Sequence, residues 1–271
     1  MHLIKMHSLG TDYILTKYDP SINYQEASKR ILDRVFGVGA KALIVVKDIP
    51  LEMKIYDSYG KLITFDSNAL MCFSKYVFEQ KIIKSHRFEV LTGKGKVELE
   101  ITGEVPFTCN INIGKPLFNN KMLFITDSIE SFGREIVINN TYITTYSLYV
   151  GEPHMVIFTD VMNSKLQDIA DLLSSYKIFN KKINVSYAYL KEKGKFMVRT
   201  YDKENGFIHA SAQGCSAVAV AAKRLGYIKN KCQCILDYGN IDVTIDKKDN
   251  VFVLGSATDI FELEYNYNKE D

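Results

Sequence analysis

The feature that most constrains the fold is a faint internal duplication, in which one short pattern occurs once in each half of the chain. Each copy has a turn that contains glycine, a short apolar strand, a few small or polar residues, and then a helix rich in small side chains. The copies occupy residues 59–77 and 205–222. Because such self-similarity reflects repeated structural units, the sequence predicts two halves that resemble each other locally.

Strand patterns outnumber helix patterns along the chain. Alternating runs rich in valine and isoleucine predict strands at residues 42–46, 53–56, 88–91, 97–101, 110–113, 141–150, 183–190, 196–201, 234–237 and 251–254. Four segments predict helices, at residues 24–35, 69–79, 161–176 and 214–225. Asp160 is the expected N-cap of the third helix, and Gly226 the expected C-cap of the fourth. Two helices and many strands in each half indicate an α+β architecture.

The amino-acid composition limits which kinds of partner the protein is expected to bind. Of the 271 residues, 46% are hydrophobic and 24% charged, and the net charge is only +2. This balance gives no electrostatic reason to expect nucleic acid or an anionic membrane as a partner. The longest apolar stretch, residues 215–222, is far below the ~18 residues that span a bilayer. The first residues lack the pattern of a signal peptide, so we expect a cytoplasmic protein.

The five cysteines do not suggest a disulfide framework in a chain of this size. Cys232 and Cys234 alternate on an expected strand and could form half of a metal site. No second pair at zinc spacing stands nearby, so core packing is the favoured interpretation. Cys72 and Cys215 are likewise expected to pack inside helices. The sequence has no phosphate-binding glycine loop and no metal spacing, so no cofactor is expected.

Several short motifs, taken in order, resemble those of the diaminopimelate epimerase family. Residues 5–13, KMHSLGTDY, resemble K-M-H-G-L-G-N-D-F, and residues 34–40 resemble the start of R-x-F-G-I-G-A-D. Residues 59–77 are similar to D-G-S-x-x-x-x-C-G-N-G-x-R-C-F-A-R-F-V without a gap. Residues 151–154 resemble G-N-P-H, and residues 199–221 resemble R-V-Y-E-R followed by A-C-G-S-G-A-C-A-A-V-A. The resemblance therefore covers most of the chain.

The resemblance implies a fold of two pseudo-symmetric lobes that face each other across a cleft, each a mostly antiparallel sheet around a central helix. The first lobe would comprise residues 1–116 with a C-terminal strand at about 258–271, and the second residues 117–257. In such isomerases one cysteine removes the Cα proton and a second returns one. The starts of the two central helices hold the α-carboxylate of an amino acid, as helix starts do for anions. A homodimer is possible.

The chain departs from the family at both catalytic positions, where Asp66 and Ser211 replace the cysteines. A serine without an adjacent base accepts protons poorly. His209 could act as that base, although a structural role is favoured. An aspartate is a weaker base than a thiolate, because its ordinary pKa lies about 4.6 units lower. Asp66 could also be a plain N-cap, and the two roles can coexist.

The ligand-binding positions have changed as well. The turn residues of the two helix starts are Ser67, Asn68, Ala212 and Gln213. The positions that the resemblance assigns to the distal carboxylate and the amine of the substrate are Thr11, Asp57, Glu152, Asn184, Asp202 and Lys203. Two of the family's amides have become acids here, and its arginine has become a lysine, which loses bidentate carboxylate recognition. A neutral or basic amino acid is therefore expected as ligand, rather than diaminopimelate.

Three functions stay open from the sequence, and an isomerase is favoured because the resemblance implies that the two-lobed cleft and the paired helix starts are retained. The chain could be a proton-shift isomerase with Asp66 as a single base, or a racemase that pairs Asp66 with an unidentified group. It could also be a non-catalytic relative that binds a small ligand or a partner. Catalysis predicts a buried Asp66 with a raised pKa, whereas the non-catalytic alternative predicts that Asp66 caps its helix.

Overall fold

In the computed structural model the chain forms two compact units, described for residues 1–160 and 168–267. The first unit contains Met1–Ile111 and the C-terminal segment that begins at Gly255, and the second is Asn112–Leu254. The boundaries expected at residues 116 and 257 lie a few residues beyond these limits. No helix among the described residues is long and apolar enough to cross a membrane.

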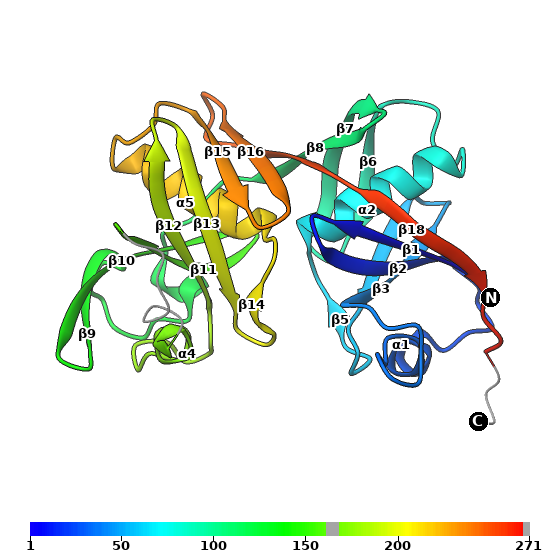
Figure 1. The fold of residues 1–271 in the computed structure, drawn as a ribbon, viewed down its shortest axis with the longest axis horizontal. Coiled ribbons are helices and arrows are strands. Elements are labelled where there is room, and N and C mark those ends of the chain that lie inside the picture. The colour runs from blue at the N-terminus through cyan, green and yellow to red at the C-terminus, as the bar shows by residue number, and fades with distance from the viewer. Residues whose placement is uncertain (161–167, 268–271) are drawn as a thin grey trace. The chain divides into compact units, whose positions relative to one another are not determined.

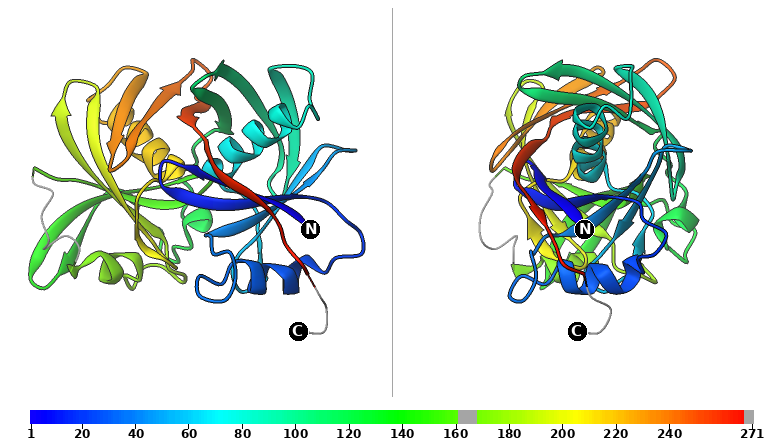
Figure 2. Two further views of the ribbon diagram at one scale, coloured as in Figure 1. Left: turned by 45° about the vertical axis from the view of Figure 1, so that its right-hand side comes forward. Right: turned by 90° about the vertical axis from the view of Figure 1, so that its right-hand side faces the viewer.

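The strands of the first unit surround its longer helix (Figure 1). The helices are α1 (Tyr24–Ile31) and α2 (Ser67–Glu79). The strands are β1 (His2–Ser8), β2 (Thr11–Lys17), β3 (Ala42–Lys47), β4 (Glu52–Tyr56), β5 (Leu62–Ile63), β6 (Arg87–Thr92), β7 (Gly95–Glu104), β8 (Phe107–Gly114) and β18 (Thr258–Glu264). Strand β1 pairs antiparallel with both β2 and β18, so the C-terminal strand belongs to this unit (Figure 2).

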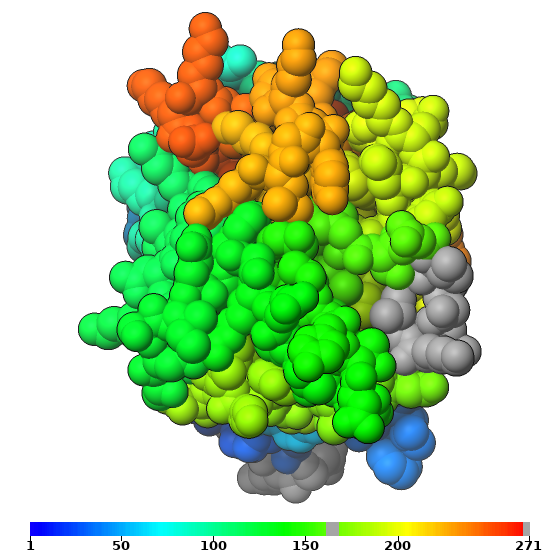
Figure 3. Space-filling view, turned by 90° about the vertical axis from the view of Figure 1, so that its left-hand side faces the viewer, coloured from blue at the N-terminus to red at the C-terminus, as the bar shows by residue number. Residues whose placement is uncertain are grey.

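The second unit is built in the same way. Its helices are η1 (Asn120–Leu123), α4 (Ala170–Ser174) and α5 (Ala212–Arg224). Its strands are β9 (Phe132–Ile138), β10 (Thr141–Val150), β11 (Glu152–Phe158), β12 (Asn184–Glu192), β13 (Lys195–Asp202), β14 (Gly206–Ile208), β15 (Lys231–Leu236), β16 (Gly239–Ile245) and β17 (Val251–Ser256). Figure 3 views this unit from the side on which β9 and β10 are exposed.

Strand pairing repeats between the units and supports the predicted duplication. In the first, β2 pairs parallel with β3, β3 antiparallel with β4, and β4 antiparallel with β5 and parallel with β6. In the second, β11, β12, β13, β14 and β15 pair in the same order and with the same directions. Helices α2 and α5 occupy equivalent places in the two chain orders. The α+β class is confirmed.

Helices α2 and α5 are the central helices of their units. All residues from Ser67 to Val77 in α2 are buried, and so are all residues from Ala212 to Ala222 in α5. A helix that is buried on all sides needs packing neighbours on every face. The small side chains of α5 allow the strands to approach it closely. The first residue of each of these two helices is therefore held inside its unit.

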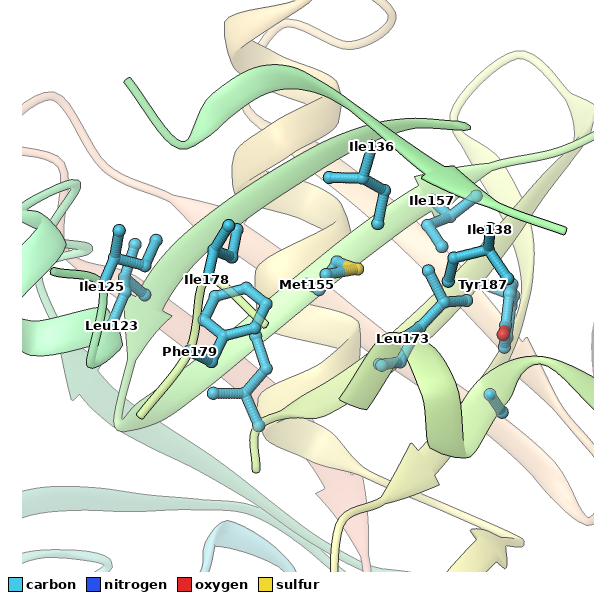
Figure 4. Packing of buried hydrophobic residues seen from close by; sticks show 13 residues of the cluster. Leu123, Ile125, Ile136, Ile138, Met155, Ile157, Leu173, Ile178, Phe179 and Tyr187 are labelled. Atoms are coloured by element: carbon cyan, nitrogen blue, oxygen red, sulfur yellow. The ribbon is translucent and has the colours of Figure 1, made fainter. Parts of the chain in front are cut away.

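A second cluster of apolar side chains stabilises the second unit on the other face of its sheet (Figure 4). Met155 and Ile157 of β11 and Tyr187 of β12 pack there against Leu173 of α4. In the first unit, Ile14 and Leu43 pack in the same manner against Ile31 of α1. Each sheet thus buries one face under a long helix and the other under a short one.

Three helix boundaries differ from those expected. The helix expected at residues 24–35 ends at Ile31, because the Asp33 carboxylate accepts backbone N–H groups from Val35 and Phe36 and forms a turn. Helices α2 and α5 both begin two residues before the expected start. Gly226 follows α5 with φ of +80°, in the conformation expected at a C-cap.

Within the helix expected at residues 161–176, the structure describes helix α4 at Ala170–Ser174. Residues 161–167, and with them the first turn that Asp160 was expected to cap, lie outside the described residues. Every predicted strand coincides with or overlaps an observed one. The strand patterns did not predict β1, β2, β9, β11 or β16.

Candidate functional site

Asp66 is the N-cap of α2, and three donors satisfy its carboxylate. Its Oδ1 accepts the backbone N–H of Ala69 at 3.0 Å, which is the capping hydrogen bond. Its Oδ2 accepts the hydroxyl of Tyr13 at 3.0 Å and the ammonium of Lys41 at 2.9 Å. The residue is 5% exposed. The carboxylate is therefore held from both oxygens by groups of its own unit.

This environment favours the charged form of Asp66. Burial raises its pKa, but the charge and hydrogen bond of Lys41 oppose burial, and so do the donors of Ala69 and Tyr13. The net result is a pKa below the ordinary value of 3.8. Burial and the adjacent Asp66 carboxylate raise the pKa of Tyr13, which keeps its hydroxyl protonated as a donor. The raised pKa expected of a general base is not found.

The two partners of Asp66 also replace family residues. Tyr13 stands where the motif K-M-H-G-L-G-N-D-F has phenylalanine, and Lys41 stands where R-x-F-G-I-G-A-D has aspartate. Where these motifs have cysteine, phenylalanine and aspartate, this chain has aspartate, tyrosine and lysine. The three replacements are in mutual contact. Asp66 and Lys41 thus form an ion pair whose carboxylate also accepts the Tyr13 hydroxyl.

A second ion pair lies beside the first. Arg34 donates two hydrogen bonds to Asp12, at 2.8 and 3.1 Å, and Lys5 lies 3.4 Å from the same carboxylate. The backbone N–H of Lys41 also donates to Asp12, which links the two pairs. Burial raises the pKa of Asp12, but Arg34 and Lys5 outweigh it and lower the pKa. Asp12 and Asp66 are thus paired with three cations, Lys5, Arg34 and Lys41.

Ser211 is the N-cap of α5. Its Oγ accepts the backbone N–H of Gly214 at 2.9 Å, and the residue is 6% exposed. The imidazole of His209 lies 3.4 Å from Asp237 and packs edge-on against Tyr238. This placement supports the structural interpretation of His209 rather than a role as base for Ser211. Both residues at the family's cysteine positions therefore cap central helices.

The strand ends around α5 bring several of the expected ligand residues together. His154 of β11 lies opposite Asn184 of β12, and the Asn184 side chain accepts the backbone N–H of Lys203 at 3.1 Å. Two residues further along β12, Ser186 contacts Gly214 at the start of α5. Asn184, Ser186 and His154 therefore share the sheet face that carries α5. His154 was not among the residues expected in the site.

Two of the expected ligand acids are held in their own turns. Asp57 accepts the backbone N–H groups of Tyr59 and Lys61. Asp202 accepts those of Glu204 and Asn205 through one oxygen, together with the Asn205 side chain.

Thr11 and the residues at the two helix starts are all buried. Thr11, Ser67 and Asn68 are at most 8% exposed in the first unit, where the Asn68 amide donates to Ser8. Ala212 and Gln213 are at most 4% exposed in the second.

The cysteines are buried, as the core-packing interpretation predicts. Burial and the nearby Asp66 carboxylate raise the pKa of Cys72, so this thiol is not a source of thiolate. Cys234 contacts both Cys215 and Cys232, and the contact with Cys215 and burial raise its pKa. No group of three or more His, Cys, Asp or Glu side chains in residues 1–160 and 168–267 is arranged to hold a metal ion.

Solved structures named as a racemase and as a phenazine biosynthesis protein share this fold. A PhzF-family phenazine biosynthesis protein from Bacillus anthracis superposes with a TM-score of 0.72 at 11% identity, covering 98% of this chain and 99% of that one. A probable proline racemase from Agrobacterium radiobacter superposes with a TM-score of 0.73 at 11% identity, covering 100% of this chain and 94% of that one. The predicted fold is confirmed.

The chain also resembles curated proteins in sequence. No family model matches the chain. The diaminopimelate epimerase of Clostridium perfringens is 28% identical over 98% of this chain and 99% of its own length. That of Methanocaldococcus jannaschii is 28% identical, and 97% of each chain is covered. The resemblance to the diaminopimelate epimerase family is confirmed over nearly the whole length of the chain.

Proposed function

We propose that this chain is a relative of the diaminopimelate epimerases that binds an amino acid without two-base proton transfer. The observation that carries the proposal is the Asp66 carboxylate, which caps α2 and accepts hydrogen bonds from Tyr13 and Lys41. A general base works best with a pKa near the working pH, whereas the pKa of Asp66 lies below its ordinary value. Ser211, which caps α5, carries a hydroxyl that accepts a proton poorly without an adjacent base.

The proposed ligand is an amino acid with a neutral or basic side chain. Its α-carboxylate would bind at the start of a central helix, where the unpaired backbone donors and the helix dipole favour an anion. We assign ligand contacts to Thr11, Asp57, Ser67, Asn68, Glu152, Asn184, Asp202, Lys203, Ala212 and Gln213. The Lys203 ammonium is a point charge and cannot donate two parallel hydrogen bonds as arginine does, which disfavours a distal carboxylate.

Calorimetry tests the ligand class. We expect L-lysine or L-ornithine to bind more tightly than meso-diaminopimelate, because acids replace two of the family's amides. Tighter binding of diaminopimelate would refute the assignment. D-Lysine is a useful further probe, since a binding protein need not accept both enantiomers as an epimerase must.

A second candidate is an isomerase with altered catalytic residues, such as an amino-acid racemase or a proton-shift isomerase. The observation that favours it is the near-complete coverage of curated relatives named as diaminopimelate epimerases. Here Asp66 and Ser211 would be the catalytic residues, and Asp66 would have to leave its ion pair in the complex.

Proton NMR in heavy water separates the two candidates. The protein is incubated with a panel of basic, neutral and dicarboxylic amino acids, and the Cα hydrogen is followed for exchange with solvent. The binding proposal expects saturable binding without exchange. Exchange that Asp66→Asn abolishes would support the isomerase instead, while the same Asn variant should still fold because an amide oxygen can cap α2.

A further inference from the structure

Exposed lysines gather at one end of the sheet in the second unit, on or beside three turns. The turns are the connection between β12 and β13 at residues 193–194, the segment between α5 and β15 at residues 225–230, and the connection between β16 and β17 at residues 246–250. The exposed lysines there are Lys191, Lys193, Lys229, Lys231, Lys247 and Lys248. We call these six residues the lysine patch.

Backbone hydrogen bonds hold the three turns next to one another. Gly194 accepts the backbone N–H of Gln233 at 2.9 Å, which joins the first turn to β15. Asn230 accepts the backbone N–H of Ile245 at 2.7 Å, which joins the other two turns. Strands β13, β15 and β16 are neighbours, and neighbouring strands lie about 4.8 Å apart, so the patch is about 15–20 Å across. In Figures 1 and 3 the three segments meet near the upper end of this unit.

The acids of this region leave the lysine patch unneutralised. Glu192 pairs with Lys195 at 2.7 Å, and Asp249 pairs with Lys223 at 2.7 Å. Asp246 accepts two backbone N–H groups within its own turn. In residues 1–160 and 168–267, none of the six patch lysines forms an ion pair with a carboxylate.

The positive charge is therefore local. The Debye length is about 8 Å at physiological salt, similar to the spacing of six cations in a patch of this width, so their potentials reinforce one another. The net charge of +2 did not predict this, because it averages the patch with the rest of the chain.

The form of the lysine patch indicates the kind of partner. A Cβ atom added at Gly194 would meet no atom within 4 Å, so this turn projects into open space. The three turns carry no arginine, the residue that recognises single phosphates and bases through paired hydrogen bonds. Their one aromatic ring, Tyr227, packs edge-on against Phe158 instead of standing among the lysines as a platform for bases. Lysines on projecting turns suit an extended anionic surface.

We propose that the lysine patch docks the protein reversibly on a bilayer that contains anionic lipids. The ammonium groups contact the negatively charged headgroups, and the attraction is electrostatic, so it weakens as the salt concentration rises. This inference goes beyond the proposed function and does not depend on amino-acid binding.

Sedimentation of the full chain with vesicles tests the docking surface. Vesicles of phosphatidylcholine and phosphatidylserine should bind the protein at low salt and release it at high salt, whereas vesicles of phosphatidylcholine alone should not bind it. The double variant Lys193→Gln/Lys231→Gln should bind about thirtyfold more weakly, the effect of roughly 2 kcal/mol. The control Lys121→Gln/Lys177→Gln removes two exposed lysines of the same unit outside the patch and should bind like the wild-type protein.

The outcomes that would overturn the proposal are distinct. If the protein ignores anionic vesicles at low salt, or if both double variants lose binding equally, the lysine patch is not a docking surface. Inorganic phosphate should displace the protein no better than chloride at equal ionic strength, and better displacement would assign the lysines to free phosphate. If polyuridine RNA binds more tightly than the vesicles and Lys193→Gln/Lys231→Gln loses it, the partner is a nucleic acid. Equal thermal unfolding of the two variants confirms that both are folded.

Discussion

At the scale of single residues, the central feature is a carboxylate that caps a helix at the position where the family motif has a cysteine. Asp66 interacts with one backbone donor, one phenol and one ammonium, so its charge is stabilised where it stands. Ser211 interacts with one backbone donor. The two positions are equivalent in the duplicated pattern but differ in how strongly the fold depends on them.

Alanine substitutions measure this difference. Asp66→Ala removes a cap and one acceptor each from the Lys41 ammonium and the Tyr13 hydroxyl, so we expect a loss of roughly 3 kcal/mol in the free energy of unfolding. Ser211→Ala should cost about 1 kcal/mol, the usual value of a cap. Urea unfolding of both variants provides the comparison. Equal losses would mean that the ion pair with Lys41 contributes little.

At the scale of the elements, the start of α5 is packed too tightly to accept a side chain at Gly214. A Cβ atom there would lie 2.4 Å from Oγ1 of Thr200 and 2.8 Å from Oγ of Ser186. Both hydroxyls belong to strands beneath the helix, so the helix start would have to move away from the sheet. The glycine thus fixes the distance between α5 and the strands that carry Ser186 and Thr200.

Gly214→Ala should therefore destabilise the protein by about 1–3 kcal/mol, the usual cost of overpacking, although alanine is the better helix former. Combining it with Thr200→Ala removes the nearest obstacle and should recover part of the loss. Thermal unfolding of the single and double variants tests this coupling. Additive losses would show that the contact with Thr200 does not limit α5.

The sequence predicted the elements and the family better than the local chemistry of the site. Alternation of apolar residues predicts β3 or β12, because such patterns arise from burial within one element. It misses β1 and β2, whose polar ends mask the alternation. Capping by Asp66 was one of two open alternatives. Its partner Tyr13 lies in β2 and its partner Lys41 directly before β3, and only their departures from the family motifs offered a signal.

At the scale of the whole molecule, buried carboxylates make stability depend on pH in the acid range. The pKa values of Asp66 and Asp12 are lower in the fold than their ordinary values. Their stabilising contribution is therefore complete above about pH 4, near the pKa of an unfolded aspartate. It is lost as the pH falls through the lower values of the folded state.

Chemical unfolding as a function of pH should show this loss. The wild-type protein should be more stable than Asp66→Asn at pH 7, and the difference should shrink as the pH falls below about 4. The variant keeps a capping oxygen and similar size, so it isolates the charge. A difference that grows on acidification would mean that the fold raises the pKa of Asp66.

The state of the Asp66 carboxyl group is the most direct test of whether this position is a fixed anion or a proton carrier. Carbon NMR of the side-chain carboxyl, titrated from pH 7 downward in the full chain with Asp66→Asn to assign the signal, gives its pKa. We predict a value below the ordinary 3.8, unchanged by a bound amino acid. A carboxyl that titrates near neutral pH, with or without ligand, would identify Asp66 as a base and contradict the proposed function.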